Sequence, residues 1–370
     1  MTNSLRKIRT DFLQRPVSPT WDITQSYFWN FENGPLFNAE IPPRPMADKP
    51  RRLLDFTLNS PVGVAAGPLL NSKWIKLYAE LGFDILTYKT VRTKARESFL
   101  EPNIVFVEMG EPFEPSYLPD TVQTGAMPKD ISEITITNSF GMPSPAPEYW
   151  QQDLRRAKSF LGKGQLLIVS VVGTDEGMGL EELAADFAQC ATLAANAGAD
   201  IVEANLSCPT VSSMEARLYL DPDAALTIVG SIRKAIENVP LAVKLGYFPH
   251  IDFMVELVKQ IGPLIDVLVA INATSAKVID ASGHPALPGR VTSGICGARI
   301  RKLGLQTVAK LNQTRQESGL DFKIIGCGGI SKVSHAKEYL EIGADAVEVA
   351  TAAIWNPYLA LQFAMSDAMR

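Results

Sequence analysis

The sequence predicts an α/β protein that folds as a (β/α)8 barrel, a TIM barrel, with an N-terminal extension and an insertion after strand 2. Short apolar, β-branched runs alternate with stretches of helical spacing, which is the pattern of a parallel sheet buried on both faces. A chain of 370 residues is long enough for one such barrel. The runs expected to form the eight strands are 62–66, 85–89, 166–172, 201–205, 241–245, 267–272, 323–326 and 346–349.

Helices are expected between these strands, and three of them end at a glycine that precedes the next strand: Gly82, Gly198 and Gly343. The main alternative is an open, doubly wound sheet. That fold predicts a GxGxxG turn after an early strand, and the sequence has none. The expected helices are 73–81, 180–197, 222–236, 253–261, 299–316 and 334–342.

The chain divides into an N-terminal extension, 1–50, and a barrel domain, 51–370. The extension is rich in aromatic residues and proline and shows no clear period. It lacks the basic amphipathic stripe of an interfacial helix, so we expect it to pack along the barrel. The connection 90–165 is too long for a simple crossover and includes a strand-like segment, 134–137, which predicts an inserted hairpin or lid.

Composition excludes several classes of protein. Hydrophobic residues make up 46% of the chain, and the net charge is −5 with scattered basic residues, so disorder and nucleic-acid binding are not expected. The four cysteines and three histidines show no metal-ligand spacing, so no metal site is predicted. No signal peptide or long apolar span is present, and the expected location is cytoplasmic.

Polar residues and glycines stand where the predicted strands end, which is where the active sites of such barrels lie. Gly328-Gly329 precedes a helix, and Ala350-Thr351 follows the last strand. Loops after strands 7 and 8 commonly bind phosphate, although a plain tight turn also uses glycine. The other strand ends carry Ala65-Ala66-Gly67, Lys89-Thr90, Asn205 and Asn272.

Lys244 lies inside an apolar strand, where a lysine is costly without an anionic partner. It fits either a Schiff-base lysine, as in aldolase barrels, or a cation beside a cofactor that gains negative charge. The alternative is an ammonium group that only reaches the barrel rim.

Cys208 follows a strand in a polar loop and could act as a nucleophile or a general base. The alternative is an incidental free cysteine, as expected for Cys190 in its helix. No histidine–aspartate pair flanks Cys208, which disfavours a protease-like nucleophile. Together with the amides of Asn138, Asn205 and Asn272, the lysine, the thiol and the phosphate-binding turns indicate a flavin mononucleotide and a small ring substrate.

Three segments carry a resemblance to a known family: Asn138-Ser139-Phe140-Gly141-Met142-Pro143, Asn205-Leu206-Ser207-Cys208-Pro209 and Ile325-Gly326-Cys327-Gly328-Gly329-Ile330. Over about 54–364 the sequence resembles the dihydroorotate dehydrogenases, which are FMN-dependent (β/α)8 barrels. The cysteine is similar to the base of the soluble class 1 enzymes, whereas the membrane-associated class has serine there.

The resemblance implies a role for each matching residue. Cys208 is the catalytic base, and Lys244 is a catalytic residue beside the flavin. FMN contacts are implied for Ala65, Ala66, Gly67, Lys89, Thr90, Asn205, Lys244, Gly294, Gly328, Gly329, Ala350 and Thr351, with Gly294 on a phosphate-binding turn. Substrate contacts are implied for Lys89, Asn138, Gly141, Met142, Asn205, Thr210, Asn272 and Ala273.

The implied reaction removes a proton to Cys208 and a hydride to flavin N5, under a loop, 211–215, that closes over the substrate. Thr210 and Ala273 depart from the pattern of dihydroorotate-oxidising members, so the ring substrate is dihydroorotate or a related dihydropyrimidine. We expect weak turnover of dihydroorotate unless Thr274 or Ser275 supplies the missing contacts.

Other functions and the partners stay open at this point. The alternatives are a dihydropyrimidine dehydrogenase-like or other ene-reductase activity, a Lys244 Schiff-base aldolase and a non-catalytic flavin-binding protein. The electron acceptor is open between fumarate, a quinone and a partner reductase. A homodimer is expected, with no nucleic-acid partner.

Overall fold

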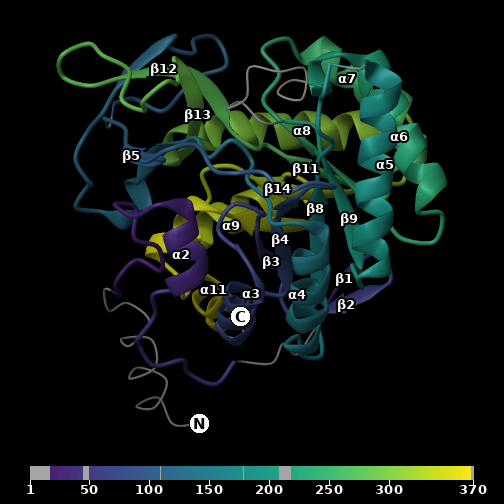
Figure 1. Ribbon diagram of the computed structural model, residues 1–370, viewed down its shortest axis with the longest axis horizontal. Helices are drawn as coiled ribbons and strands as arrows, with labels where there is room; N and C mark the ends of the chain where they lie inside the picture. Colours follow the sequence, from purple (N-terminus) through teal and green to yellow (C-terminus); the bar gives the residue numbers. More distant parts are fainter. Residues whose placement is uncertain (1–16, 45–49, 109, 178, 208–217, 368–370) are drawn as a thin grey trace.

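Eight parallel strands form a closed barrel in the computed structural model, which describes residues 17–44, 50–108, 110–177, 179–207 and 218–367 (Figure 1). Around the barrel the strand order is β10-β11-β14-β15-β3-β4-β8-β9. The predicted barrel is confirmed, and each predicted run supplies one strand. In chain order the strands are β3 (Val62–Val64), β4 (Ile85–Val91), β8 (Leu166–Val171), β9 (Ile201–Asn205), β10 (Leu241–Leu245), β11 (Val267–Ala270), β14 (Lys323–Cys327) and β15 (Ala346–Val349).

Helices connect successive strands and cover the outside of the barrel, with α5 and α6 lying side by side (Figure 1). Local chemistry fixes where some of them begin. The Asp221 side chain accepts a hydrogen bond from the backbone N–H of Ala224, and Pro222 occupies the first turn of α6. The helices are α3 (Ser72–Glu80), α4 (Pro147–Ser159), α5 (Leu180–Asn196), α6 (Pro222–Ala235), α7 (Ile251–Ile261), α8 (Arg301–Glu317), α9 (Val333–Glu341), α10 (Thr351–Trp355) and α11 (Leu359–Asp367).

A second sheet of five strands lies at one end of the barrel, in the order β5-β7-β13-β12-β6. β5 (Ile104–Phe106), β6 (Thr121–Gln123) and β7 (Thr135–Asn138) come from the predicted insertion after β4. β12 (Thr274–Ile279) and β13 (Thr292–Gly297) come from an insertion after β11 that the sequence did not reveal. β12 alternates buried and more exposed side chains, unlike the mainly apolar barrel strands on which the prediction depended.

The described part of the N-terminal region, 17–44, packs against the barrel. This region contains the helix α2 (Tyr27–Asn33). Trp21 is 4% exposed and Tyr27 is 1% exposed. The centre of the Trp21 ring lies 5.3 Å from that of Trp74 on α3. Arg44 forms a salt bridge with the buried Asp84 at the start of β4. No helix in the described residues is both long and apolar enough to cross a membrane.

The barrel interior changes from apolar to polar along its axis. Side chains of a strand alternate between its two faces, so Ile201, Glu203 and Asn205 share the inner face of β9. Ile201 belongs to a buried apolar cluster that includes Leu53 and Leu58 of the hairpin formed by β1 (Arg51–Leu53) and β2 (Phe56–Leu58). Glu203 and Asn205 line a cavity at the opposite end, where the strands terminate.

Candidate active site

The cavity opens at the carboxyl ends of the barrel strands and, with its open mouth, holds about 1350 Å³. The barrel supplies its polar floor, and the second sheet, Trp21 and helix α10 supply apolar walls. Most of the predicted site residues meet here. They are Ala65, Ala66, Gly67, Lys89, Thr90, Asn138, Met142, Asn205, Lys244, Asn272, Ala273, Gly328, Gly329, Ala350 and Thr351.

Four predicted residues are placed elsewhere or lie outside the described part of the chain. Gly294 is in the middle of β13, opposite Asn138, rather than on a turn. Neither Gly294 nor Gly141 is among the described residues that line the cavity. Cys208, Thr210 and the predicted closing loop, 211–215, lie outside the described residues.

Lys244 lies in the cavity floor between two buried carboxyl groups. Its Nζ is 3.7 Å from Oε2 of Glu348, and the two side chains are 6% and 0% exposed. Glu348 Oε1 accepts a hydrogen bond of 2.6 Å from the Thr87 hydroxyl. Glu203, 1% exposed, lines the same floor from the neighbouring strand. The anionic partners that a buried lysine needs are therefore present.

This environment keeps the Lys244 amine protonated. Burial alone lowers the lysine pKa, but Cys327, Glu203 and Glu348 outweigh it, so the pKa of Lys244 lies above its ordinary value. Burial raises the pKa of the Cys327 thiol, which is therefore neutral near pH 7. We therefore assign the raised pKa of Lys244 chiefly to the carboxyl groups of Glu203 and Glu348. A Schiff-base lysine must attack as a neutral amine, so this site opposes the aldolase mechanism.

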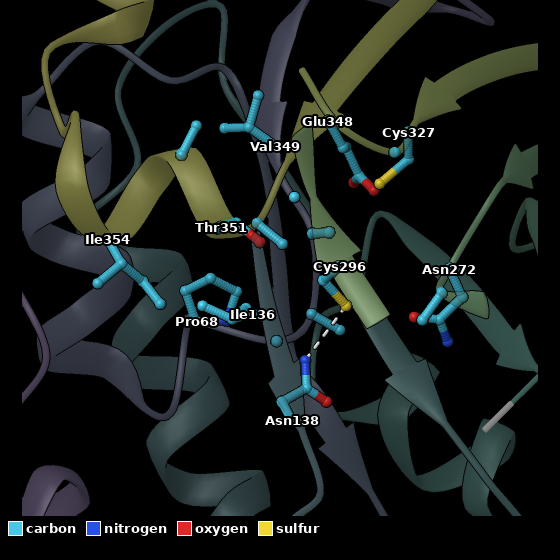
Figure 2. Close-up of a pocket in the computed structure, with 18 of the residues that line it drawn as sticks. Pro68, Ile136, Asn138, Asn272, Cys296, Cys327, Glu348, Val349, Thr351 and Ile354 are labelled. Atoms are coloured by element: carbon cyan, nitrogen blue, oxygen red, sulfur yellow. Dashed lines mark hydrogen bonds between the residues drawn. The ribbon is translucent and has the colours of Figure 1, made fainter. Parts of the chain in front are cut away.

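The predicted asparagines hold the floor and one wall of the cavity. Asn205 Oδ1 accepts a hydrogen bond of 3.2 Å from the Ser207 backbone N–H. The Asn272 amide donates to the Ser207 carbonyl oxygen and, at 3.3 Å, to its hydroxyl. Ser207 immediately precedes Cys208, so two strands fix the chain at this point. Figure 2 shows Asn138 donating its amide to the Cys296 thiol at 3.3 Å.

The Gly328-Gly329 turn forms a cradle that side chains would obstruct. Both residues have positive φ values, +117° and +69°. A Cβ at Gly329 would lie 2.7 Å from the backbone of Arg301, and one at Gly328 would lie 2.9 Å from Ile271. Thr351 lines the cavity from the next strand end. A glycine turn before a helix, with a hydroxyl beside it, is typical of the phosphate sites of such barrels.

Comparisons with known proteins agree on one family. A family model described as "Dihydroorotate dehydrogenase" matches residues 126–363. The chain is 37% identical over 365 residues to "Dihydroorotate dehydrogenase" of Dictyostelium discoideum, covering 95% of this chain and 98% of that protein. The chain belongs to the dihydroorotate dehydrogenase family.

Two further members are more distant. The chain is 27% identical over 308 residues to "Dihydroorotate dehydrogenase B (NAD(+)), catalytic subunit" of Thermoplasma acidophilum, covering 83% of this chain and 88% of that protein. The crystal structure of the Eimeria tenella dihydroorotate dehydrogenase in complex with ferulenol is 18% identical and covers 86% of this chain and 82% of that chain. Its TM-score of 0.68 shows the same fold.

Dihydroorotate dehydrogenases are FMN-dependent flavoproteins, and the residues of this cavity fit FMN. The glycine cradle and the Thr351 hydroxyl, which both line the cavity, suit a phosphate group, while the Lys244 cation suits a ring system that gains negative charge. The apolar wall, which includes Trp21, Ile136 and Ile354, suits the flat apolar face of the isoalloxazine. The protein is therefore an FMN-dependent oxidoreductase of this family.

Sequence reasoning missed several cavity residues, chiefly Glu203, Glu348 and Cys296. The sequence does contain a feature that marks the two glutamates as candidate site residues. Each is a charged residue within an apolar strand, two positions before a predicted site residue, Asn205 or Ala350, and therefore on the same face. The same signal singled out Lys244. No such feature marks Cys296, because its strand, β13, belongs to the insertion that was not predicted.

Proposed function

We propose that this chain oxidises dihydroorotate to orotate, with FMN as the hydride acceptor and Cys208 as the base. The single observation that carries the proposal is the buried Lys244 cation at the floor of a cavity with a phosphate cradle. Family membership over nearly the whole chain supports dihydroorotate as the substrate.

The roles of the chain's residues follow from their contacts. When bound, FMN would supply the hydride acceptor for the substrate carbon. The Cys208 sulfur receives the proton from the neighbouring carbon, and an ordinary thiol pKa of about 8.5 suits this at mildly alkaline pH. Asn205 and Asn272 orient the segment before Cys208 through Ser207. Lys244 stabilises negative charge at the site without a change in its own protonation.

Substrate contacts are proposed for Lys89, Asn138, Asn205 and Asn272, which line the cavity. A second candidate substrate, a related dihydropyrimidine, is favoured by one specific feature. Ala273, 7% exposed, lines the cavity but offers no side-chain hydrogen bond to a ring carboxylate. Thr274 follows in the chain and has a buried Oγ1 without a hydrogen-bond partner among the described residues, but it is not one of the residues that line the cavity.

We also propose a cytoplasmic homodimer. Free thiols are typical of reducing compartments, and Cys190 and Cys327 are free thiols among the described residues. Leu100 and Val291 are large apolar side chains with 78% and 64% exposure, which a second subunit could cover.

The experiment that tests the proposal measures orotate formation by the purified flavoprotein with a panel of acceptors: fumarate, a soluble quinone, and NAD(+) with a partner reductase. NAD(+) belongs in the panel because it stands in the names of the dihydroorotate dehydrogenase B relatives. Orotate formation with at least one acceptor supports the proposal. Oxidation of dihydrouracil but not of dihydroorotate would assign the second substrate instead.

A further inference from the structure

Three ionisable side chains meet inside the barrel below the cavity. Glu203, Lys244 and Glu348 project from β9, β10 and β15, and each is at most 5% exposed. Figure 2 shows Cys327 and Glu348 pointing toward one another. With both carboxyl groups ionised, this cluster would carry one surplus negative charge in a region with little solvent, where an unbalanced charge is costly.

The hydrogen bonds of the two carboxyl groups are incomplete. Thr87 donates to Oε1 of Glu348, and Ser170 donates to Glu203. Oε2 of Glu203 and Oε2 of Glu348 are buried and have no hydrogen-bond donor in the part of the chain that the structure describes. A proton on one carboxyl group would supply a donor and remove the surplus charge at the same time.

We propose that Glu203 and Glu348 together form a redox-linked store for one proton, which is partly filled in the oxidised protein, fills when the bound flavin is reduced and empties on reoxidation. The inference rests on the proposed placement of the flavin ring beside Lys244. Hydride and proton leave the substrate as described above, and the stored proton comes from and returns to solvent. The carboxyl groups are neither oxidised nor reduced.

The electrostatics of the cavity support this role. Burial, together with the charge of Glu348, raises the pKa of Glu203 to about 7, although Lys244 and Ser170 act in the opposite direction. Glu203 therefore holds a proton more readily than an ordinary carboxyl group, and added negative charge beside Lys244 would raise its proton affinity further. The other titratable groups lining the cavity are Lys89, Lys244, Cys296, Cys327 and Glu348.

Lys244 keeps its proton because its pKa lies above the ordinary lysine value. Burial raises the pKa of the Cys327 thiol, so this thiol keeps its proton near pH 7. Glu203 and Glu348 are the carboxyl groups among the described residues that line the cavity, and we infer that this pair exchanges a proton as the flavin changes charge. By linkage, a pair that binds a proton more tightly in the reduced protein makes the flavin midpoint potential fall more steeply as the pH rises.

The test is the midpoint potential of bound FMN as a function of pH, in the parent, Glu203→Gln, Glu348→Gln and the surface control Glu341→Gln. Photoreduction or dithionite supplies the electrons, so the result does not depend on dihydroorotate. Uptake of one extra proton for two electrons makes the midpoint potential fall by about 30 mV more per pH unit. We expect this extra slope near pH 7 in the parent and Glu341→Gln, and its loss in both buried variants.

Equal slopes in all four proteins would overturn the proposal. Proton uptake by the parent on reduction, measured with an indicator dye in weak buffer, gives a second reading that needs no variant. It should exceed the uptake of free FMN near pH 7, and equal uptake would also contradict the store. A parent that shows the extra slope but does not oxidise dihydroorotate would refute the proposed substrate and leave the proton store in place.

Discussion

Lys244 on β10 and Glu348 on β15 lie across the barrel interior with Nζ and Oε2 separated by 3.7 Å, and neither side chain is more than 6% exposed. The contact explains how an apolar strand tolerates a lysine. It also fixes the charge that the lysine presents to the cavity, because a buried ammonium beside carboxylates stays protonated.

Removal of the Lys244 cation should destabilise the protein strongly. In Lys244→Met the buried carboxyl groups lose their counter-charge, and breaking a buried pair costs about 3–5 kcal/mol. Urea denaturation with FMN in excess measures this loss. The double variant Lys244→Met/Glu348→Gln should regain part of the stability, and purely additive losses would mean that the two side chains are not coupled.

Stability should depend on pH through Glu203. Its pKa is raised from 4.5 to about 7 in the folded protein, so between these values the folded state holds more protons than the unfolded state. The free energy of unfolding therefore falls as the pH rises through this window, by up to about 3 kcal/mol from this group. The decrease should be smaller in Glu203→Gln, and an unchanged pH profile would refute the assignment.

The glycine cradle predicts a difference between two alanine substitutions. Gly329 and Gly319 both have positive φ, +69° and +63°, so alanine strains the backbone similarly at either position. Only at Gly329 does the added Cβ meet another segment, the backbone of Arg301 at 2.7 Å. Gly329→Ala should bind FMN at least tenfold more weakly, about 1.4 kcal/mol, while Gly319→Ala keeps the parental affinity.

Fluorescence titration of the apoprotein with FMN measures both affinities. Equal FMN binding by the two variants would place the phosphate elsewhere.

The proposed role of Cys208 as the base predicts a loss of reaction rate without a loss of FMN. Cys208→Ala should keep bound FMN but lose about 10²- to 10⁴-fold in the rate of flavin reduction by substrate, because only the proton acceptor is removed. Anaerobic stopped-flow absorbance measures this rate, with Cys190→Ala as the control for loss of a buried thiol away from the cavity. A Cys208→Ala rate equal to that of the parent would exclude Cys208 as the base.

Substrate fit can be tested at the two positions that depart from the family pattern. Each buried group left without a partner costs about 1–3 kcal/mol, so the parent should turn over dihydroorotate slowly unless Thr274 compensates. Thr210→Asn with Ala273→Ser should then raise kcat/KM for dihydroorotate. No gain in the double variant would show that other residues set the specificity.

The barrel was predictable because its strands are short, mainly apolar runs that alternate with stretches of helical spacing. The second sheet was predictable only in part. β7 is a β-branched run, whereas β12 alternates buried and more exposed side chains over only six residues, which is a weaker signal than the apolar runs of the barrel.

Site residues were predictable from the sequence where a residue type is unusual at its position in the fold. Lys244 within an apolar strand and the Gly328-Gly329 turn are both unusual in a purely structural barrel. The partners of Lys244 were not predicted, because a strand sequence does not show which side chains face each other across a closed barrel. That pairing depends on the order and stagger of the strands, and the fold supplies both.

The central claim is tested most directly by mixing the yellow, oxygen-free protein with one equivalent of dihydroorotate and recording the flavin absorbance together with orotate. The account predicts that the flavin band bleaches and that about one orotate forms for each FMN reduced. A flavin band that stays unchanged, with dihydroorotate recovered intact, would contradict it.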